Sequence, residues 1–431
     1  MSSARFRFLL NHKYLFGAKL INIQRASFST TIPALAKAQV KKEVKKKAPA
    51  FKQVRNEEKP KGKRSQSSTG FHESNVGKSN PKFYKQKPIV QVEEAKPGGL
   101  SVDAVGKMYT YPNDIMEKIN VFGVPLVMSK EMKIFPKLSW VARDATLDLA
   151  KKLDESKNKP STETRIILVG PLGVGKSSIL LQMVGHALAA DWIVIYIPSA
   201  IDLINGKYAY VQVSSDNYVQ PTLIVKILKQ VHSVNNDKFT VQDYKTIADL
   251  IDRSKSGPAA QTALEQMFDI IDKSSMPVLL AIDEINALYV TTEYTSPDHT
   301  LLEPGKLLLP RTLLEYISGR KKFRNGAVIG ATSLVHKPTL SYALDAALHL
   351  TEVSPWKQVS PEIARYINKE VKRYNISEYS KDEAKTLLDF YIRNNVVHED
   401  ADATTSESFT KKYMLSNGNA RKFLEYCSKR L

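Results

Sequence analysis

Residues 164–178 read Thr-Arg-Ile-Ile-Leu-Val-Gly-Pro-Leu-Gly-Val-Gly-Lys-Ser-Ser. The apolar, β-rich run 164–169 leads directly into a glycine-rich segment, and residues 176–190 follow with apolar side chains at helical spacing. The pattern Gly-x-x-x-x-Gly-Lys-Ser/Thr, typical of a phosphate-binding loop, is matched by Gly170, Gly175, Lys176 and Ser177. Because a strand precedes this loop and a helix follows it, we predict a P-loop rather than a chance glycine turn.

Each residue type in this segment suits the binding of phosphate. Glycines allow backbone N–H groups to converge on phosphate oxygens without a Cβ in the way. The ammonium of Lys176 is expected to reach the β- and γ-phosphates, and the hydroxyl of Ser177 to ligate Mg²⁺. The nucleotide-binding residues predicted in this segment are Gly170, Gly173, Gly175, Lys176, Ser177 and Ser178.

A second motif, Val-Leu-Leu-Ala-Ile-Asp-Glu at 278–284, is an apolar strand that ends in two acids. Asp283, at the carboxyl edge of the strand, suits a contact with Mg²⁺, usually through water. Glu284 is placed to polarise an attacking water and is the candidate catalytic residue. The alternative is a strand-to-loop transition with surface acids, but the phosphate-binding pattern upstream favours the functional interpretation.

Two further positions near the predicted site allow two interpretations each. Thr332 and Ser333 follow the apolar run 327–331, where a small polar group can touch the γ-phosphate or the attacking water, or can simply cap a helix. Arg421 follows an Asn-Gly turn and either folds back onto the phosphates or lies on the surface. We retain Thr332 and Arg421 as candidate nucleotide-binding residues.

Other residues are better explained without a functional role. Arg320 and Arg324 are more simply surface residues than arginine fingers of an oligomer. The guanine signature Asn-Lys-x-Asp is not met, because Asn368-Lys369-Glu370 lacks the decisive acid. The choice between GTP and ATP therefore stays open.

Further apolar runs alternate with helical segments. The predicted strands are 164–169, 192–197, 277–282, 327–331 and 348–353. Residues 137–153 and most of 216–273 are expected to be helical, and only helices are expected after Pro355. This alternation predicts an α/β fold with a parallel sheet covered on both faces, followed by a small helical domain.

The charge of the chain is concentrated at its N-terminus. Of 431 residues, the first hundred carry a net charge of +16 and the remaining 331 only +3. Residues 1–42 contain no acid and are rich in Arg, Lys and hydroxyl side chains, which is typical of a mitochondrial transit peptide. A single cysteine, Cys427, excludes a disulfide within the chain, and no apolar run reaches the ~20 residues that span a bilayer.

Residues 37–100 are rich in Lys, Pro, Gly, Ser and Gln and hold too few apolar side chains to fold alone. Such a basic arm is a candidate for contact with phosphate backbones, and a solvated tail is the equally simple alternative. The predicted organisation is a transit peptide at 1–35, a basic disordered arm at 36–104, a P-loop domain at 105–355 and a helical lid domain at 356–431.

The motifs together resemble those of a known family. The chain is similar to the death-associated-protein-3 family, and to its fungal members most. The similarity lies in residues 170–178, Trp-Ile-Val-Ile-Tyr-Ile-Pro at 192–198, Asp-Glu-Ile-Asn-Ala-Leu at 283–288 and Asn417–Arg421. The resemblance implies an AAA+-like core that binds a purine nucleotide, GTP or ATP, with Mg²⁺. It also implies a place in the small subunit of the mitochondrial ribosome, bound to ribosomal RNA and proteins and near the large subunit.

Two functions are compatible with these features. One is a structural ribosomal protein whose nucleotide is mainly architectural, and the other is an active AAA+-type ATPase or a GTPase that acts in ribosome assembly. In some relatives the second acid of the 278–284 motif is missing, so Glu284 leaves hydrolysis open here. No convincing arginine finger or pore loop is found, which favours the structural function.

Overall fold

The computed structural model describes residues 91–95, 104–131, 134–135, 137–335, 341–354, 356–368, 370–397 and 405–428. The predicted transit peptide lies outside these ranges, and so does the predicted arm except for residues 91–95 and Ala104. Within the described ranges, no helix is both long enough and apolar enough to cross a bilayer.

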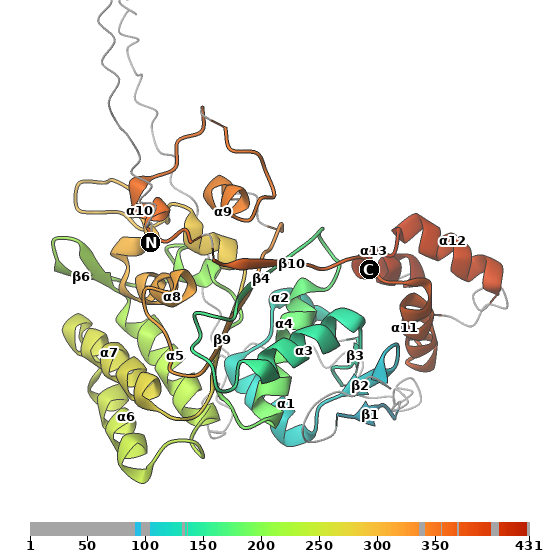
Figure 1. The fold of residues 1–431 in the computed structure, drawn as a ribbon, viewed down its shortest axis with the longest axis horizontal. Coiled ribbons are helices and arrows are strands. Elements are labelled where there is room, and N and C mark those ends of the chain that lie inside the picture. The colour runs from blue at the N-terminus through green and yellow to red at the C-terminus, as the bar shows by residue number, and fades with distance from the viewer. Residues whose placement is uncertain are drawn as a thin grey trace, which may run out of the picture. The chain divides into compact units, whose positions relative to one another are not determined.

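A five-stranded parallel sheet forms the centre of the described chain, in the strand order β10-β4-β9-β8-β5. Three of these strands, β4, β9 and β10, are labelled in Figure 1. The strands are β4 (Arg165–Val169), β5 (Ile193–Ile197), β8 (Val278–Asp283), β9 (Gly326–Ala331) and β10 (Lys372–Asn375). Every residue of β4, β5, β8 and β9 is buried, because helices cover both faces of the sheet. The predicted α/β fold with a parallel sheet is confirmed.

The fifth strand is a correction to the sequence analysis. Residues 348–353, predicted as a strand, follow the short helix α9 (Tyr342–Ala347) as turns and coil, and the side chain of Val353 is 79% exposed. The actual fifth strand, β10, lies in the segment predicted to contain only helices. It reads Lys-Arg-Tyr-Asn and is largely exposed, because an edge strand needs to pair on one side only.

The predicted helix over 137–153 is also corrected. Its first part forms β3 (Trp140–Val141), which joins β1 (Glu93–Glu94) and β2 (Met108–Thr110) in a small sheet. The helix α3 begins only at Asp144 and runs to Glu155. The indole of Trp140 packs against the rings of Tyr109 and Tyr111, so tertiary aromatic contacts favour the strand.

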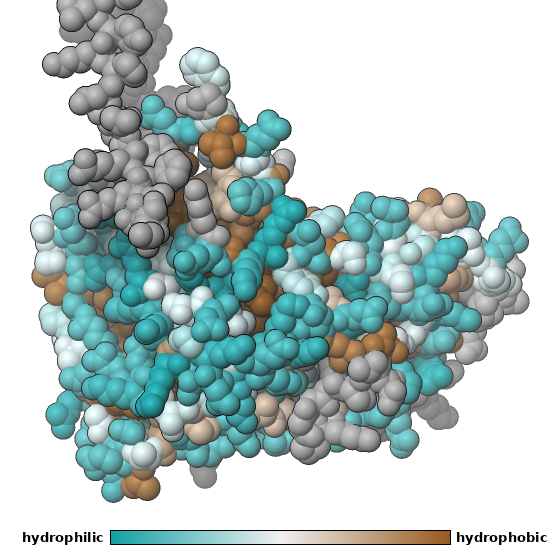
Figure 2. Space-filling model, in the orientation of Figure 1, coloured by the Kyte–Doolittle hydropathy of each residue, from teal (hydrophilic) through white to brown (hydrophobic). Residues whose placement is uncertain are grey.

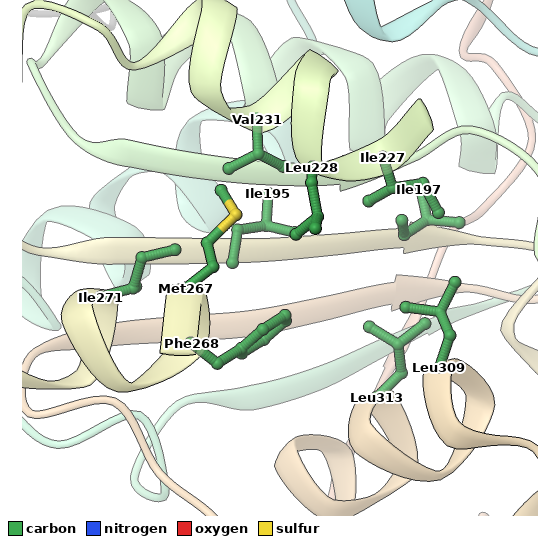
Figure 3. A pocket seen from close by; sticks show the side chains of 10 residues that line it. All are labelled: Ile195, Ile197, Ile227, Leu228, Val231, Met267, Phe268, Ile271, Leu309 and Leu313. Carbon is green, nitrogen blue, oxygen red and sulfur yellow. The ribbon is translucent and has the colours of Figure 1, made fainter. Parts of the chain in front are cut away.

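One face of the sheet is covered by α4 (Lys176–Ala189), which packs with α1 (Asn113–Phe122) and α3. The other face is covered by α5 (Pro221–Val234), α7 (Gly257–Lys273) and α8 (Leu308–Ser318). Side chains from β5, α5, α7 and α8 meet there around an apolar cavity of about 10 Å³ (Figure 3). The void is small because the interior is packed at close to crystal density.

The helices begin where their sequences supply a cap. Pro221 opens α5 at a position whose N–H needs no partner. Ser256 caps α7 by accepting a hydrogen bond from the Ala259 N–H. The predicted capping box of α11 (Lys381–Arg393) is confirmed, since Ser380 and Glu383 bond each other's backbone N–H groups.

Three C-terminal helices, α11, α12 (Ser406–Ser416) and α13 (Ala420–Cys427), pack together as the lid (Figure 1). They form an apolar cluster around Tyr391 and Phe423 that also includes Val141 of β3. Phe135 from the N-terminal segment stacks on Tyr391 at a ring distance of 5.6 Å. The thiol of Cys427 is buried in this cluster.

The remaining elements are shorter or peripheral. They are α2 (Leu126–Glu131), η2 (Ile201–Leu203), β6 (Val211–Ser214), β7 (Asn217–Val219), α6 (Val241–Arg253), η3 (Ile285–Tyr289), η4 (Pro304–Lys306) and α10 (Pro361–Ala364). The face shown in Figure 2 is mostly hydrophilic. Apolar side chains that are nevertheless exposed flank α9, among them Leu334, Leu350, Val353 and Trp356.

Candidate nucleotide site

The segment Gly170–Ser177, here called the glycine loop, joins the carboxyl end of β4 to the first turn of α4. Gly170, Gly173 and Gly175 have φ angles of +149°, +86° and +95°. A side chain at any of them would strain the backbone, which is why the sequence uses glycine there. Gly175, in the left-handed conformation, is also the N-cap of α4.

The glycine loop is closely approached by two later parts of the chain. A Cβ at Gly170 would lie 2.5 Å from the carbonyl oxygen of Ile376, and one at Gly173 would lie 2.4 Å from Oδ1 of Asn419. Ile376 follows β10, and Asn419 is the N-cap of α13 in the lid. The glycines therefore serve the packing of the loop as well as its curvature.

Lys176 folds back over the glycine loop. Its Nζ donates hydrogen bonds of 2.8 Å to the carbonyl oxygens of both Gly170 and Pro171. Burial lowers the pKa of Lys176 to about 8, with a smaller lowering from Arg421 and an opposing contribution from Asp283. The ammonium is thus poorly solvated, and a phosphate group would supply the negative charge that it lacks.

Asp283 and Ser177, the two predicted metal ligands, lie in contact. Ser177 Oγ donates a hydrogen bond of 3.0 Å to Asp283 Oδ1, which also accepts one of 2.9 Å from the Glu284 N–H. The carboxyl is 1% exposed, and burial raises its pKa to about 7 against the opposing hydrogen bond from Ser177. A buried carboxylate beside a hydroxyl is an oxygen donor set that suits Mg²⁺ held mainly by phosphates and water.

This donor set does not suit a transition metal held by the protein alone. In the part of the chain that the structure describes, no three His, Cys, Asp or Glu side chains are grouped as metal ligands. Mg²⁺ needs few protein ligands when a nucleotide supplies phosphate oxygens. Ser177 and Asp283 are therefore residues that could supply the protein oxygens for a magnesium nucleotide.

Glu284, the candidate catalytic residue, has a left-handed backbone with φ +57° and ψ +35°. Its Oε2 accepts a hydrogen bond of 2.7 Å from Ser199 Oγ. A non-glycine residue in this conformation is strained, and such strain is often found at functional sites. Ser199, which follows β5, was missed by the sequence analysis because no pattern links it to Glu284.

Thr332 bonds to the strand β4, and Ser333 bonds to the helical turn η3. Thr332 Oγ1 donates 3.1 Å to the carbonyl oxygen of Leu168, at the end of β4. Ser333 and Asn286 exchange two hydrogen bonds, from Ser333 N–H to Asn286 Oδ1 at 2.8 Å and from Asn286 Nδ2 to Ser333 O at 3.0 Å. These bonds fix the loop after β9 to β4 and to the segment after β8, at the edge where the glycine loop begins.

A cavity of about 270 Å³ lies beside the glycine loop on the Thr332 side. Gly170 and Pro171 form one wall, and Asn286, Thr332 and Asp345 contribute polar groups. The cavity has room for a phosphate group and for water.

Arg421 reaches the glycine loop through its backbone, because its N–H donates 3.3 Å to the carbonyl oxygen of Gly173. Asn419 Nδ2 donates to the carbonyl oxygen of Leu172 at the tip of the loop. Arg320 lies elsewhere: its guanidinium donates to the carbonyl oxygen of Arg365 and lies over the ring of Tyr366. The structure thus brings Arg421 to the loop, whereas Arg320 contacts residues that directly follow α10.

Arg143 is the second residue that the sequence analysis missed. Its buried guanidinium donates to Val174 in the glycine loop and pairs with Glu383 in α11 at 3.2 Å. A lone arginine before an amphipathic helix has no local signal that could have revealed this role.

Comparison with known proteins places these features in a family. The family model described as mitochondrial ribosomal death-associated protein 3 matches residues 140–426, about two thirds of the chain. The match covers the glycine loop, the 278–284 motif and the lid except for the last residue of α13.

Several curated proteins named small ribosomal subunit protein mS29 are similar to the chain. The one from Schizosaccharomyces pombe is 28% identical over 78% of this chain and 75% of its own length. Those from Neurospora crassa and Mus musculus are 25% and 21% identical, over 75% and 83% of this chain and 75% and 94% of their own lengths. The chain therefore belongs to the mitochondrial ribosomal death-associated protein 3 family.

Proposed function

We propose that this chain is a structural component of the small subunit of the mitochondrial ribosome, located in the matrix, where it supports mitochondrial translation. Its family membership and the names of its relatives in S. pombe, N. crassa and mouse support this proposal. Its partners are then the ribosomal RNA and proteins of the small subunit, with a contact to the large subunit. The basic N-terminal hundred residues suit a contact with RNA phosphates.

The proposal includes a purine nucleotide, GTP or ATP, held with Mg²⁺ on the glycine loop. The backbone of Gly170–Ser178 and the ammonium of Lys176 would hold the phosphates, and Ser177 and Asp283 would hold the metal directly or through water. Thr332 and Arg421 would stand beside the γ-phosphate. The phosphates of the bound nucleotide would supply negative charge, which the loop N–H groups and the Lys176 ammonium would stabilise.

The observation that carries an architectural nucleotide is the contact between the glycine loop and the lid. Asn419 and Arg421 bond to Leu172 and Gly173 at the tip of the loop. A ligand that orders the loop therefore also orders the surface on which the lid rests. A ligand at a hundred times its dissociation constant adds about 2.7 kcal/mol to the stability of the folded state, a large share of the roughly 5–15 kcal/mol of a whole domain.

The test compares two variants in vivo. Lys176→Ala removes the side chain that binds phosphate and is expected to lower the abundance of assembled small subunits and mitochondrial translation together. Glu284→Gln keeps an oxygen for the Ser199 hydroxyl and removes only the carboxylate that can polarise water, so it is expected to assemble and translate nearly normally. A Glu284→Gln strain as defective as Lys176→Ala would overturn the structural role.

One observation favours the second candidate function, a working ATPase or GTPase in ribosome assembly. Glu284 is present, is held by Ser199 and lies next to the buried Asp283. Slow nucleotide hydrolysis by the purified chain that is abolished in Glu284→Gln would support that candidate. Translation in the Glu284→Gln strain that equals that of the wild type would still assign the hydrolysis no essential role.

A further inference from the structure

Arg143 is a buried cation at the start of α3, and its side chain is 4% exposed. Three parts of the chain surround it: the glycine loop, the linker 376–379 that follows β10, and the first turn of α11. Because burying a guanidinium is costly unless its N–H donors are satisfied, its acceptors show what the residue holds together.

The acceptors come from segments far apart in the sequence. Arg143 Nη1 donates 3.2 Å to the carbonyl oxygen of Val174. Nη2 donates 3.0 Å and 2.9 Å to the carbonyl oxygens of Ser377 and Glu378 in the linker. Nε donates 3.2 Å to Oε1 of Glu383, and the guanidinium carbon lies 4.1 Å from the centroid of the Tyr379 ring. One planar side chain therefore ties together the loop, the linker and the lid.

The bond to Val174 orients an N–H group of the glycine loop. The Val174 carbonyl and the Gly175 N–H belong to the same planar trans peptide and point in opposite directions. By holding the carbonyl, Arg143 also directs the Gly175 N–H away from itself. An N–H of this loop at the start of α4 is one of the groups that would bind phosphate.

The bond to Glu383 orients the lid. Glu383 Oε2 accepts a hydrogen bond of 2.8 Å from the Ser380 N–H as part of the capping box of α11. Its other oxygen, Oε1, accepts from Arg143. The first turn of α11 is thereby fixed to the same guanidinium that holds the glycine loop.

We propose that Arg143 is a positioning residue that couples the glycine loop to the lid. A nucleotide that orders the peptide between Val174 and Gly175 strengthens the hydrogen bonds of Arg143 to the linker and to α11. The position of the lid in turn sets the affinity of the loop for the nucleotide. This coupling rests on the proposed nucleotide function. Lysine cannot replace arginine here, because an ammonium is a point charge that cannot reach acceptors on three segments at once.

The experiment is hydrogen exchange of the full chain with Mg²⁺, in the absence and presence of non-hydrolysable analogues of GTP and ATP. In the wild-type chain the analogue that binds is expected to slow exchange in residues 173–178 and also in α11 and α13. In Arg143→Lys the slowing in the loop should persist while that in the lid is lost. The affinity for the analogue should fall about tenfold, a usual size for coupling between two sites.

Two further variants separate coupling from a loss of stability. Arg165→Lys is the matched control: Arg165 is also a buried arginine, but it lies at the opposite end of β4 and donates to Thr162, Ile317 and Glu370. It should destabilise the fold and leave the response of the lid intact. Glu383→Gln disrupts the coupling from the lid side, because Ser380 and Arg143 donate to different carboxylate oxygens of Glu383, and glutamine presents an NH₂ group in place of one of them.

The outcomes separate the two proposals. If neither analogue slows exchange in the wild-type loop, the nucleotide function is wrong and the coupling falls with it. If the wild-type chain responds in both regions but Arg143→Lys and Glu383→Gln keep the response of the lid, the nucleotide function stands and the coupling through Arg143 is wrong. If Arg143→Lys does not fold, Glu383→Gln alone decides, because it leaves Arg143 and the glycine loop unchanged.

Discussion

The hydroxyl of Ser177 donates a hydrogen bond of 3.0 Å to the buried carboxyl of Asp283. Ser177 belongs to the first turn of α4 and Asp283 ends β8, so the bond joins the two motifs that the sequence assigned to phosphate and metal. Parallel strands end at the same edge of a sheet, and this edge is where open α/β folds bind their ligands.

Asp283→Asn should stabilise the nucleotide-free chain. Asparagine can still accept from Ser177 and from the Glu284 N–H, while it removes a carboxyl whose pKa is raised to about 7 by burial. Above pH 7 the gain should be on the order of a few kcal/mol, and the Mg²⁺-dependent stabilisation by nucleotide should disappear. Thermal melting with and without Mg²⁺-nucleotide measures both effects. Glu284→Gln is the control, and an Asp283→Asn chain that keeps its Mg²⁺ response would rule out the metal role.

Gly173→Ala should loosen the lid. The residue has φ +86°, and a Cβ would lie 2.4 Å from Asn419 Oδ1, the group that caps α13. The strain alone costs about 1–2 kcal/mol, and displacement of the cap adds to it. Faster hydrogen exchange in α13 is the expected result. Gly106→Ala is the matched control, since Gly106 has φ +75° with nothing within 4 Å of its Cβ position. Equal effects of the two variants on α13 would contradict the contact with the lid.

Asp272→Asn tests the pH dependence of stability. Burial raises the pKa of Asp272 to about 6, although Tyr316 donates it a hydrogen bond of 2.7 Å. A raised carboxyl pKa means that the folded chain binds the proton more tightly than the unfolded chain, so its contribution to stability falls as the pH rises from about 4 to about 6. Asparagine keeps the acceptor for Tyr316 and lacks the charge.

The stability advantage of Asp272→Asn over the wild type should therefore grow across this range and then stay constant. It should reach on the order of 1 kcal/mol, since the group is partly solvated and its charge is screened. Urea unfolding at several pH values measures the difference, and Asp252→Asn, at an exposed position of α6, is the control. A difference that does not change with pH would show that Asp272 titrates normally.

The basic N-terminal arm, outside the described residues, gives the fourth prediction. Residues 41–64 contain 11 Lys and Arg and 3 acids. If they contact RNA phosphates, their deletion should weaken binding to small subunits and reduce its salt dependence, because fewer counterions are released. Co-sedimentation at several salt concentrations measures this. Unchanged affinity with an unchanged salt slope would identify the segment as a solvated tail.

The central sheet was largely predictable because its signals are local. The apolar runs that became β4, β5, β8 and β9 each lie between turn residues, and they are buried on both faces. The strand β10 was not predictable, because its sequence Lys-Arg-Tyr-Asn carries no apolar pattern. Its pairing with β4, about 200 residues earlier in the chain, makes it a strand.

The same distinction holds for the candidate site. The sequence by itself determined the glycine loop and Asp283, because glycine spacing and an acid after an apolar strand are local patterns that follow from backbone sterics and burial. Only the tertiary structure decided that Ser199 holds Glu284 and that Arg143 joins Val174 to Glu383. Ser199 and Glu284 are 85 positions apart, Arg143 and Val174 are 31 apart, and Arg143 and Glu383 are 240 apart. A hydrogen bond between residues so distant leaves no periodicity in either segment.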